Sequence, residues 1–575
     1  MGARGRVPWT WLALGLFLLL CLRPLSGNWS TAVIAPFGGL DALFQAGLLE
    51  WGVRHVWHPA VWRDLPIFHP AETAIAFMDP LTAQAVLVTP LRWLGATPAA
   101  LYNAAWLISL VLAGAATAAL WRATGGGARA GALAALALIG SPYTLSQLGH
   151  LNQLPPPGVP AALAALACAL AAWERGAATA RAWGLLAGVL VIQAAMGWYG
   201  FAYACLALAV VLMIRLPRLL RRPGRRRPLL SALPPLVLAA AGVWLLAAPH
   251  LETSFREPEF TRHLGEVRWF SADAQHLLNT GAYRAGPADW AGRGVGTETR
   301  HHGVARQVLH PGWTALLLAG LGFAARGALD ARRRAWGYAI LAAGAVGLVL
   351  AFGDSVGLPG GERRLTLPMG WLQRVFEPAR AYRAVWRFSF LFTLAVAWWA
   401  AVGWSRLASL PGRRGRFLSV GAVLVLVLES APVSVPVLVL ADQTRTVPHR
   451  LTDEAALTLP AAPDVYGEDL REARWLWRSL ASGRPVTGGV SGWVPPWTRE
   501  LRRRLATCED GQEDPDALFA ELAATGVTRV EMFVDDADDR LAYWREILRA
   551  RVGAPVLEGG VEVYDLPPVS PPPRR

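Results

Sequence analysis

Apolar stretches long enough to cross a lipid bilayer recur over the first 432 residues of the chain and then stop. A straight membrane-spanning helix needs roughly 20 such residues, so the ends of the shorter stretches are approximate. The pattern predicts eleven crossings, near residues 9–25, 98–121, 130–146, 158–173, 183–198, 200–215, 229–249, 313–325, 336–352, 387–404 and 417–432. We therefore expect an α-helical polytopic membrane protein whose transmembrane domain covers residues 1–432.

Arginine gathers in the short loops between alternate crossings. These loops hold 21 arginines and two acids, and the chain has no lysine. Because cytoplasmic loops carry an excess of basic residues, the N-terminus is expected inside, and the outer segments are residues 26–97, 146–157, 250–312, 353–386 and 433–575. The lysine-free composition is typical of high-GC bacteria, so the expected location is the bacterial cytoplasmic (inner) membrane, with the C-terminal domain extracytoplasmic.

The net charge of +14 is thus mainly a signal of topology, and nucleic-acid binding is not expected. The missing lysine excludes P-loop nucleotide binding and Schiff-base chemistry. The four cysteines are spaced too widely for a disulfide framework or a cysteine zinc site.

The first outer loop, residues 26–97, carries two apolar pieces that are not counted as crossings. Apolar positions between residues 40 and 57 predict an amphipathic helix on the membrane surface, beginning beside Asp41. Residues 78–95 must stay on the outer side, because a further crossing would place the next arginine loop outside. The apolar stretch 9–25 is interpreted as an uncleaved anchor, with a cleaved signal peptide as the alternative.

The tail from residue 433 has the pattern of a small α/β domain. It contains 17 arginines and 23 acids, a helical pattern over 516–525, a strand over 527–534 and a hairpin over 555–564. We expect a folded domain over residues 433–566 and disorder over 567–575, where proline dominates.

Ionisable residues close to the outer face are candidates for chemistry there, because charged groups near lipid are expensive. A carboxylate in the first outer loop could serve as a base, and Arg380, Arg383 and Arg387 could bind a phosphate, since guanidinium matches phosphate oxygens. The plain alternatives are that Asp41 only caps its helix and that the arginines only extend to the membrane surface.

Short motifs along nearly the whole chain resemble the GT-C type of integral-membrane glycosyltransferase, which includes protein O-mannosyltransferases, lipid A aminoarabinose transferases and many bacterial relatives. They are Asp41 to Trp51, Phe68-His69-Pro70, Asp79-Pro80-Leu81, Thr89-Pro90-Leu91, Tyr102-Asn103, Gly149-His150-Leu151, Arg383 with Trp386-Arg387-Phe388, Gly488 to Gly492 and Gly526-Val527.

The resemblance implies transfer of a sugar from a polyprenyl-phosphate or polyprenyl-diphosphate carrier to a lipid, glycan or protein on the outer side. Asp41 matches the position of the family's base, and Asp79, Glu72 and His69 are assigned to orient the acceptor or a divalent metal. Whether a metal is needed is left open.

The lipid-linked donor is assigned to Arg380, Arg383, Arg387 and His150. We expect an inverting transfer of a hexose or pentose. Two other functions stay open: a transporter or flippase for lipid-linked sugars, and a non-catalytic membrane assembly protein.

Overall fold

The computed structural model describes residues 9–35, 40–175, 180–220, 231–256, 264–279, 307–357, 364–432, 435–440, 455–459, 470–488, 494–534, 539–558 and 560–566. The chain divides into two compact units. One consists of residues 1–26, 106–248 and 257–435, and the other of residues 27–105, 249–256 and 436–575.

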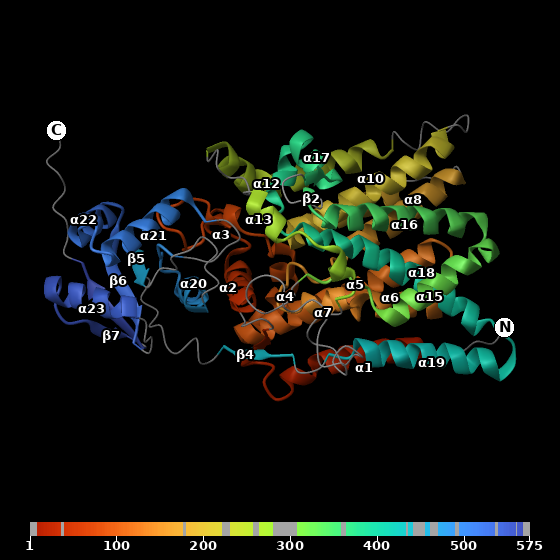
Figure 1. Cartoon of the computed structure of the whole chain (residues 1–575), viewed down its shortest axis with the longest axis horizontal. Coiled ribbons are helices and arrows are strands. Elements are labelled where there is room, and N and C mark those ends of the chain that lie inside the picture. The colour runs from red at the N-terminus through yellow and green to blue at the C-terminus, as the bar shows by residue number, and fades with distance from the viewer. Residues whose placement is uncertain are drawn as a thin grey trace. The chain divides into compact units, whose positions relative to one another are not determined.

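Apolar helices build the first unit (Figure 1). Their alanine- and leucine-rich sequences favour helix, and a helix satisfies its backbone polar groups internally, as a lipid environment requires. The helices are α1 (Trp9–Leu22), α5 (Pro98–Ala123), α6 (Ala128–Ile139), α7 (Pro142–Ser146), α8 (Gly158–Glu174), α9 (Ala180–Met196), α10 (Trp198–Leu220), α12 (Leu233–Arg256), α15 (Trp313–Ala324), α16 (Ala331–Ala351), α18 (Phe390–Ala408) and α19 (Gly412–Ser430). Helices α5 and α12 each run from one unit into the other.

Within the described part of the chain, five helical segments are long and apolar enough to cross a membrane: Pro98–Ala123, Trp198–Pro217, Leu233–Arg256, Ala331–Ala351 and Val385–Ala408. Each of the eleven predicted crossings overlaps a helix, several of which are short. The membrane character of the chain is therefore clear, whereas the number of crossings stays a prediction.

Helix α18 belongs to the candidate span Val385–Ala408, which is the most buried of the five. In its most apolar 18-residue stretch, 89% of the residues are buried inside the protein. Helix α18 packs closely on α15 because glycines meet at the contact. A Cβ atom added to Gly403 would lie 1.9 Å from the carbonyl oxygen of Leu318, and one added to Gly322 would lie 2.3 Å from that of Trp399. Small residues at such contacts let two helix backbones approach, as in other membrane helix pairs.

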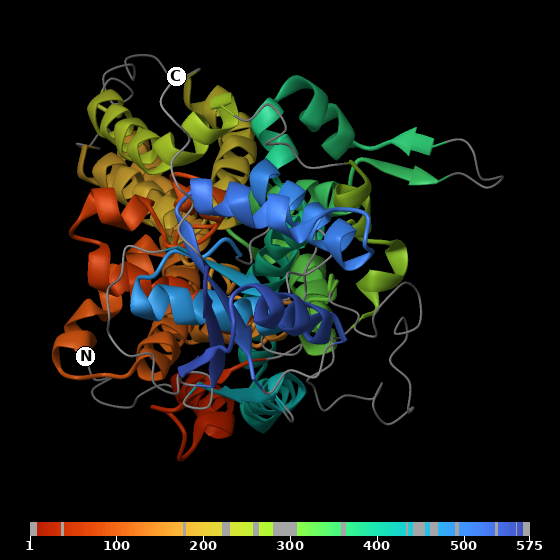
Figure 2. The same ribbon diagram turned by 90° about the vertical axis from the view of Figure 1, so that its left-hand side faces the viewer.

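Short elements connect these helices. They are the 3₁₀ turns η1 (Arg23–Leu25), η3 (Ala274–Leu277), η4 (Ala325–Ala328), η5 (Glu377–Ala381) and η6 (Val385–Ser389), the helices α13 (Leu264–Trp269) and α17 (Pro368–Val375), and the strands β2 (Ser355–Gly357) and β3 (Arg364–Thr366). Strands β2 and β3 pair antiparallel, and Figure 2 shows this hairpin projecting from the helices of its own unit.

The second unit begins with the first outer loop. Its elements are β1 (Ala32–Ile34), α2 (Leu40–His55), α3 (Pro59–Arg63), η2 (Ala74–Phe77) and α4 (Thr82–Trp93). The helix predicted over residues 40–57 is confirmed as α2, and a helix, α4, does lie within residues 78–95, with Pro90 inside it. Strand β1 pairs antiparallel with β4 (Val437–Val439) at the start of the tail.

The tail forms a four-stranded sheet in the order β5-β6-β8-β7. Its elements are β5 (Ala455–Leu459), α20 (Leu470–Ser482), α21 (Pro496–Glu509), α22 (Pro515–Ala524), β6 (Val527–Phe533), α23 (Asp539–Arg551), β7 (Val556–Glu558) and β8 (Val561–Asp565). The helix, strand and hairpin predicted here are confirmed as α22, β6 and β7–β8. Residues 567–575 lie outside the described residues.

The two faces of this sheet are covered by different helices. Val530 and Met532 of β6 share one core with α21, α22 and α23, whereas Phe533 packs against Trp475 of α20. Successive residues of a strand point to opposite faces, which explains the alternation. The predicted domain boundary at residue 432 stays a prediction; in the structure, residues 27–105 group with the tail.

Candidate functional site

Asp41 lies in the first turn of α2 and is half-buried. The unpaired N–H groups at the start of a helix stabilise a negative charge there, so the carboxylate is favoured at this position. It is also close enough to the phenol of Tyr102 in α5 to interact with it electrostatically.

A second acid on α2 was missed in the sequence. Glu50 is 2% exposed, and its Oε1 accepts a hydrogen bond from Nε of Arg54 at 2.8 Å and lies 3.4 Å from Nη2 of Arg92 on α4. Nine residues separate it from Asp41, so at about 100° per residue the two acids lie on opposite sides of the helix. The four-residue spacing of Glu50 and Arg54 was the available signal. Glu50 joins α2 to α4.

His69 lies in a turn, and the segment around it forms backbone hydrogen bonds with the tail. The N–H of Phe68 donates to Gly488 O at 3.1 Å, that of His69 to Val486 O at 2.9 Å, and that of Val486 to Pro66 O at 3.2 Å. The His69 ring also contacts the tail, with Nε2 2.8 Å from the carbonyl oxygen of Thr525. This side chain therefore links the first outer loop to the tail.

Glu72 lies three residues after His69 and is exposed, with Oε2 3.6 Å from Nη1 of Arg256. Asp64, another acid that the sequence interpretation passed over, interacts electrostatically with both Glu72 and His69. Desolvation raises the pKa of Asp64, and a hydrogen bond from the backbone of Thr73 partly offsets this effect. Asp64 is thus within electrostatic range of both side chains.

Asp79 is half-buried and directly follows Met78, whose carbonyl oxygen lies 3.1 Å from Nε2 of His250. The backbone before this region is strained, because Phe68 and Thr73 have φ values of 60° and 58°. Left-handed conformations of bulky or β-branched residues are uncommon and concentrate at functional sites.

The three arginines assigned to a phosphate lie in the first unit and differ in their surroundings. Nε of Arg380 donates to the carbonyl oxygen of Gln373 at 2.9 Å, and the residue is exposed. The guanidinium of Arg383 lies 4.9 Å from the centre of the Phe270 ring. Arg380 is thus exposed, whereas Arg383 and Arg387 are both half-buried.

Arg387 is half-buried in η6, directly before α18. Its guanidinium carbon lies 5.4 Å from the centre of the Tyr199 ring and 5.9 Å from that of Trp386. Its buried Nε has no hydrogen-bond partner among the described residues. A buried donor without a partner is costly, so the position suits an anionic ligand.

Tyrosines surround this arginine, and the sequence interpretation did not identify them. The Tyr199 ring lies 5.0 Å from that of Tyr382, and its hydroxyl accepts a hydrogen bond from the N–H of Ala384 at 3.0 Å. The Tyr143 hydroxyl donates to the carbonyl oxygen of Arg387 at 3.3 Å. These contacts hold the segment of Arg383 and Arg387 in place.

His150 is half-buried between α7 and α8, where its N–H donates to Gln147 O at 2.9 Å. It belongs to the first unit, as the arginines do, whereas Asp41, His69, Glu72 and Asp79 belong to the second. Among the described residues, no three His, Cys, Asp or Glu side chains are grouped so that they could hold a metal ion.

No protein-family model matches the chain, and no curated protein matches it. Solved structures do match: the fold is that of the GT-C type membrane glycosyltransferases, as the sequence motifs predicted. One such structure is the arabinofuranosyltransferase AftD from Mycobacteria, with a TM-score of 0.53 and 19% identity over 97% of this chain. This chain spans 40% of the length of that protein.

Another is the oligosaccharyltransferase AglB from Archaeoglobus fulgidus, in complex with an inhibitory peptide and a dolichol-phosphate. The TM-score is 0.50 and the identity 12%, over 92% of this chain and 69% of that one. At these identities the likeness concerns the fold.

Proposed function

We propose that the chain is an integral-membrane glycosyltransferase that moves a sugar from a polyprenyl-phosphate-linked donor to a lipid, glycan or protein acceptor on the outer face of the cytoplasmic membrane. The fold supports this proposal, since similar structures include an arabinofuranosyltransferase and an oligosaccharyltransferase with a bound lipid phosphate. The arginine loops support an inside N-terminus and an extracytoplasmic tail.

The observation that carries the proposal is the setting of Arg387. A guanidinium with a buried, unpartnered Nε lies among aromatic rings at the start of α18, the most enclosed of the membrane-spanning candidates. A lipid phosphate at the end of a membrane helix has the charge and the depth that this position suits. Arg383 and Arg380 add positive charge along the same segment, and His150 completes the proposed donor-binding set.

The proposed reaction is a single displacement at the anomeric carbon. Asp41 takes the proton of the acceptor hydroxyl or amine, the acceptor atom bonds to the anomeric carbon, and the bond from that carbon to the phosphate oxygen breaks. The electron pair leaves with the phosphate, whose added charge the arginines stabilise. Configuration is inverted. Asp79 and Glu72 orient the acceptor, and His69 holds the loop that bears Glu72.

A divalent metal was left open by the sequence, and the described carboxylates do not form a group suited to one. No step of the proposed reaction therefore passes through a metal ion. The mechanism depends on one base and on the positive charge near the phosphate.

The test is Asp41→Asn in full-length protein reconstituted in proteoliposomes with radiolabelled polyprenyl-phosphate pentose or hexose. General base catalysis contributes about 10²–10⁴ in rate, so turnover should fall by that factor, with unchanged membrane insertion. Asp510→Asn, at an exposed C-terminal position of α21, is the matched control and should retain full turnover. Full activity of Asp41→Asn refutes its role as the base. Transbilayer flux of the lipid without any glycosyl product favours a flippase instead.

A further inference from the structure

The segment between α16 and α18 contains the hairpin β2–β3 and the helix α17. The preceding candidate span ends at Ala351 and the following one begins at Val385. Val356 of β2 is five residues beyond Ala351, so it lies within about 18 Å of the end of that span. The start of the hairpin is therefore close to the membrane boundary.

The outward surface of the segment is apolar. Val356 and Leu365 are direct partners in the β2–β3 register, so their side chains share one face of the hairpin, and they are 45% and 54% exposed. A two-stranded hairpin is only marginally stable in water, and exposed apolar pairs leave it without a packed face. This hairpin needs an apolar environment.

Helix α17 exposes large apolar side chains on its outward side and buries a polar side chain on its other side. Its protein-facing side carries Met369 and Gln373, both buried, and the side-chain amide of Gln373 has no hydrogen-bond partner among the described residues. Its outward side carries Trp371 and Val375, one turn apart and 58% and 81% exposed. A helix on a water-soluble surface normally turns such large apolar side chains toward the protein.

The polar group on this outward side also suits a membrane surface. The guanidinium of Arg374 lies 5.4 Å from the centre of the Trp371 ring, and both side chains are exposed. Tryptophan is enriched at membrane–water interfaces, and arginine extends its charge from there toward lipid headgroups. Phe376, 54% exposed, continues the apolar surface beyond the helix.

We propose that Val356, Leu365, Trp371, Val375 and Phe376, which we call the interfacial patch, insert into the headgroup–acyl boundary of the bilayer. The occupant is the lipid surface itself. Continuity with two candidate spans places the patch at that boundary, and the outward side of α17, with exposed apolar side chains beside Arg374, matches an interfacial helix. The patch is a membrane-binding surface distinct from the spanning helices, and it does not depend on sugar transfer.

The test uses nitroxide labels on full-length protein in nanodiscs of phosphatidylcholine and phosphatidylglycerol. Labels are placed one at a time at Leu365→Cys and Val375→Cys, in a background in which the four native cysteines are replaced by serine and which must keep the unfolding temperature of the unaltered protein. The control is Leu557→Cys, which lies on β7, also in a hairpin, and is 69% exposed.

We expect the labels at 365 and 375 to be relaxed severalfold more by oxygen, which enters lipid, than by a water-soluble nickel complex. The label at 557 should show the reverse preference. Equal preferences at all three positions overturn the proposal. The labels at 365 and 375 could instead show strong spin–spin coupling between two copies of the chain, together with preferential relaxation by the water-soluble nickel complex. That result overturns the proposal and indicates a contact between copies.

Discussion

Nε2 of His69 lies 2.8 Å from the carbonyl oxygen of Thr525, a residue 456 positions later in the chain. A carbonyl oxygen only accepts hydrogen bonds, so Nε2 carries the hydrogen. The ring nitrogen nearest the tail therefore cannot act as a base while this bond is intact. The sequence motif assigned His69 to the acceptor or a metal, whereas the geometry supports a role in attaching the first outer loop to the tail.

We expect His69→Ala to lower the free energy of unfolding by about 1 kcal/mol, because the Thr525 carbonyl loses its donor. Thermal unfolding in detergent measures the change. His58→Ala in the same loop is the control, since His58 is exposed and its side chain does not cap α3. His69→Gln, which keeps an N–H donor, should recover part of the loss. Equal unfolding temperatures for the two alanine variants would mean that the bond contributes nothing.

Arg387→Gln should raise the KM for the lipid-linked donor by about 10- to 100-fold, because a charge-assisted hydrogen bond to phosphate contributes roughly 1.5–3 kcal/mol. Initial rates at varied donor concentration measure this. Arg406→Gln, an exposed arginine in the last turn of α18, is the control and should leave KM unchanged. An unchanged donor KM in Arg387→Gln would remove this residue from the proposed site.

Glu531 holds α20 against the sheet through buried charges. Its carboxylate pairs with Arg484 and lies 3.7 Å from Nε of Arg478, and all three side chains are less than one-tenth exposed. Burial lowers the pKa of Arg478, and the nearby carboxylate counters that effect. Removing this carboxylate takes away the ion-pair partner that two largely buried cations share.

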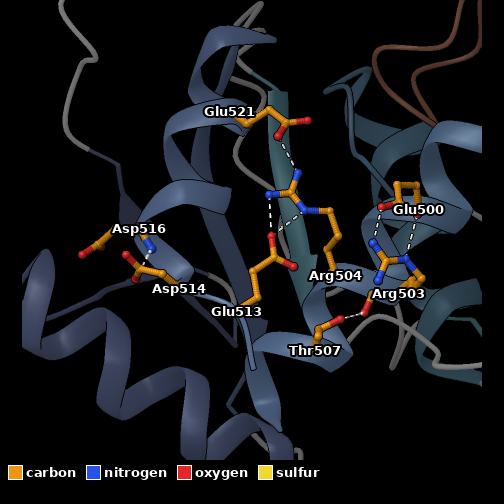
Figure 3. Close-up of polar contacts among 8 residues, drawn as sticks. All are labelled: Glu500, Arg503, Arg504, Thr507, Glu513, Asp514, Asp516 and Glu521. Carbon is orange, nitrogen blue, oxygen red and sulfur yellow. Dashed lines mark hydrogen bonds and ion pairs between the residues drawn. The ribbon is translucent and has the colours of Figure 1, made fainter. Parts of the chain in front are cut away.

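Glu531→Gln should therefore lower the free energy of unfolding by about 3–5 kcal/mol. The change in free energy is measured by unfolding the full-length protein in detergent, with proteolytic cleavage within the tail as the readout. The control is Glu521→Gln, because Glu521 pairs with Arg504 at the surface (Figure 3) and its side chain is 56% exposed. An exposed pair contributes at most about 1 kcal/mol. Similar losses in the two variants would contradict the assigned burial effect.

Substitution by alanine should change the stability of the protein differently at two glycines of α15. Gly322 faces α18, where an added Cβ would meet the Trp399 carbonyl oxygen, and Gly322→Ala should cost about 1–3 kcal/mol. Gly320 has nothing within 4 Å of such an atom, so Gly320→Ala should be neutral or stabilise by up to about 1 kcal/mol. Thermal unfolding in lipid nanodiscs separates the two. A similar loss at both positions would contradict the role of close packing between α15 and α18, because alanine favours helix over glycine wherever its Cβ atom has room.

The long apolar segments were predictable because helical periodicity and arginine-rich loops leave strong local signals. Helix α2 was predicted with Asp41 at its start, and a helix was predicted within residues 78–95, where α4 lies. The hairpin β7–β8 was found from two glycines, of which Gly560 has a φ of 80°. Each of these features is specified by neighbouring residues.

Other features depend on residues far apart in sequence. Strands β1 and β4 are three residues each, too short for a periodic pattern, and the pairing of Ala32 with Val439 joins residues that lie about 400 positions apart. The tyrosines around Arg387 come from separate helices and look like ordinary membrane aromatics. The exposed apolar side chains of α17 become visible only when burial is known, because sequence alone does not say which side of a short helix faces the protein.

The backbone bonds from Phe68 and His69 to the tail also set an order of events during synthesis. The partners Gly488 and Val486 are made about 420 residues later, and at roughly 5–20 residues per second the ribosome needs about 20–80 seconds to reach them. During that time the first outer loop is already present without the strand that receives it. The acids of this loop therefore reach their final arrangement only after the membrane helices have been made, so a chain truncated before residue 486 cannot form it.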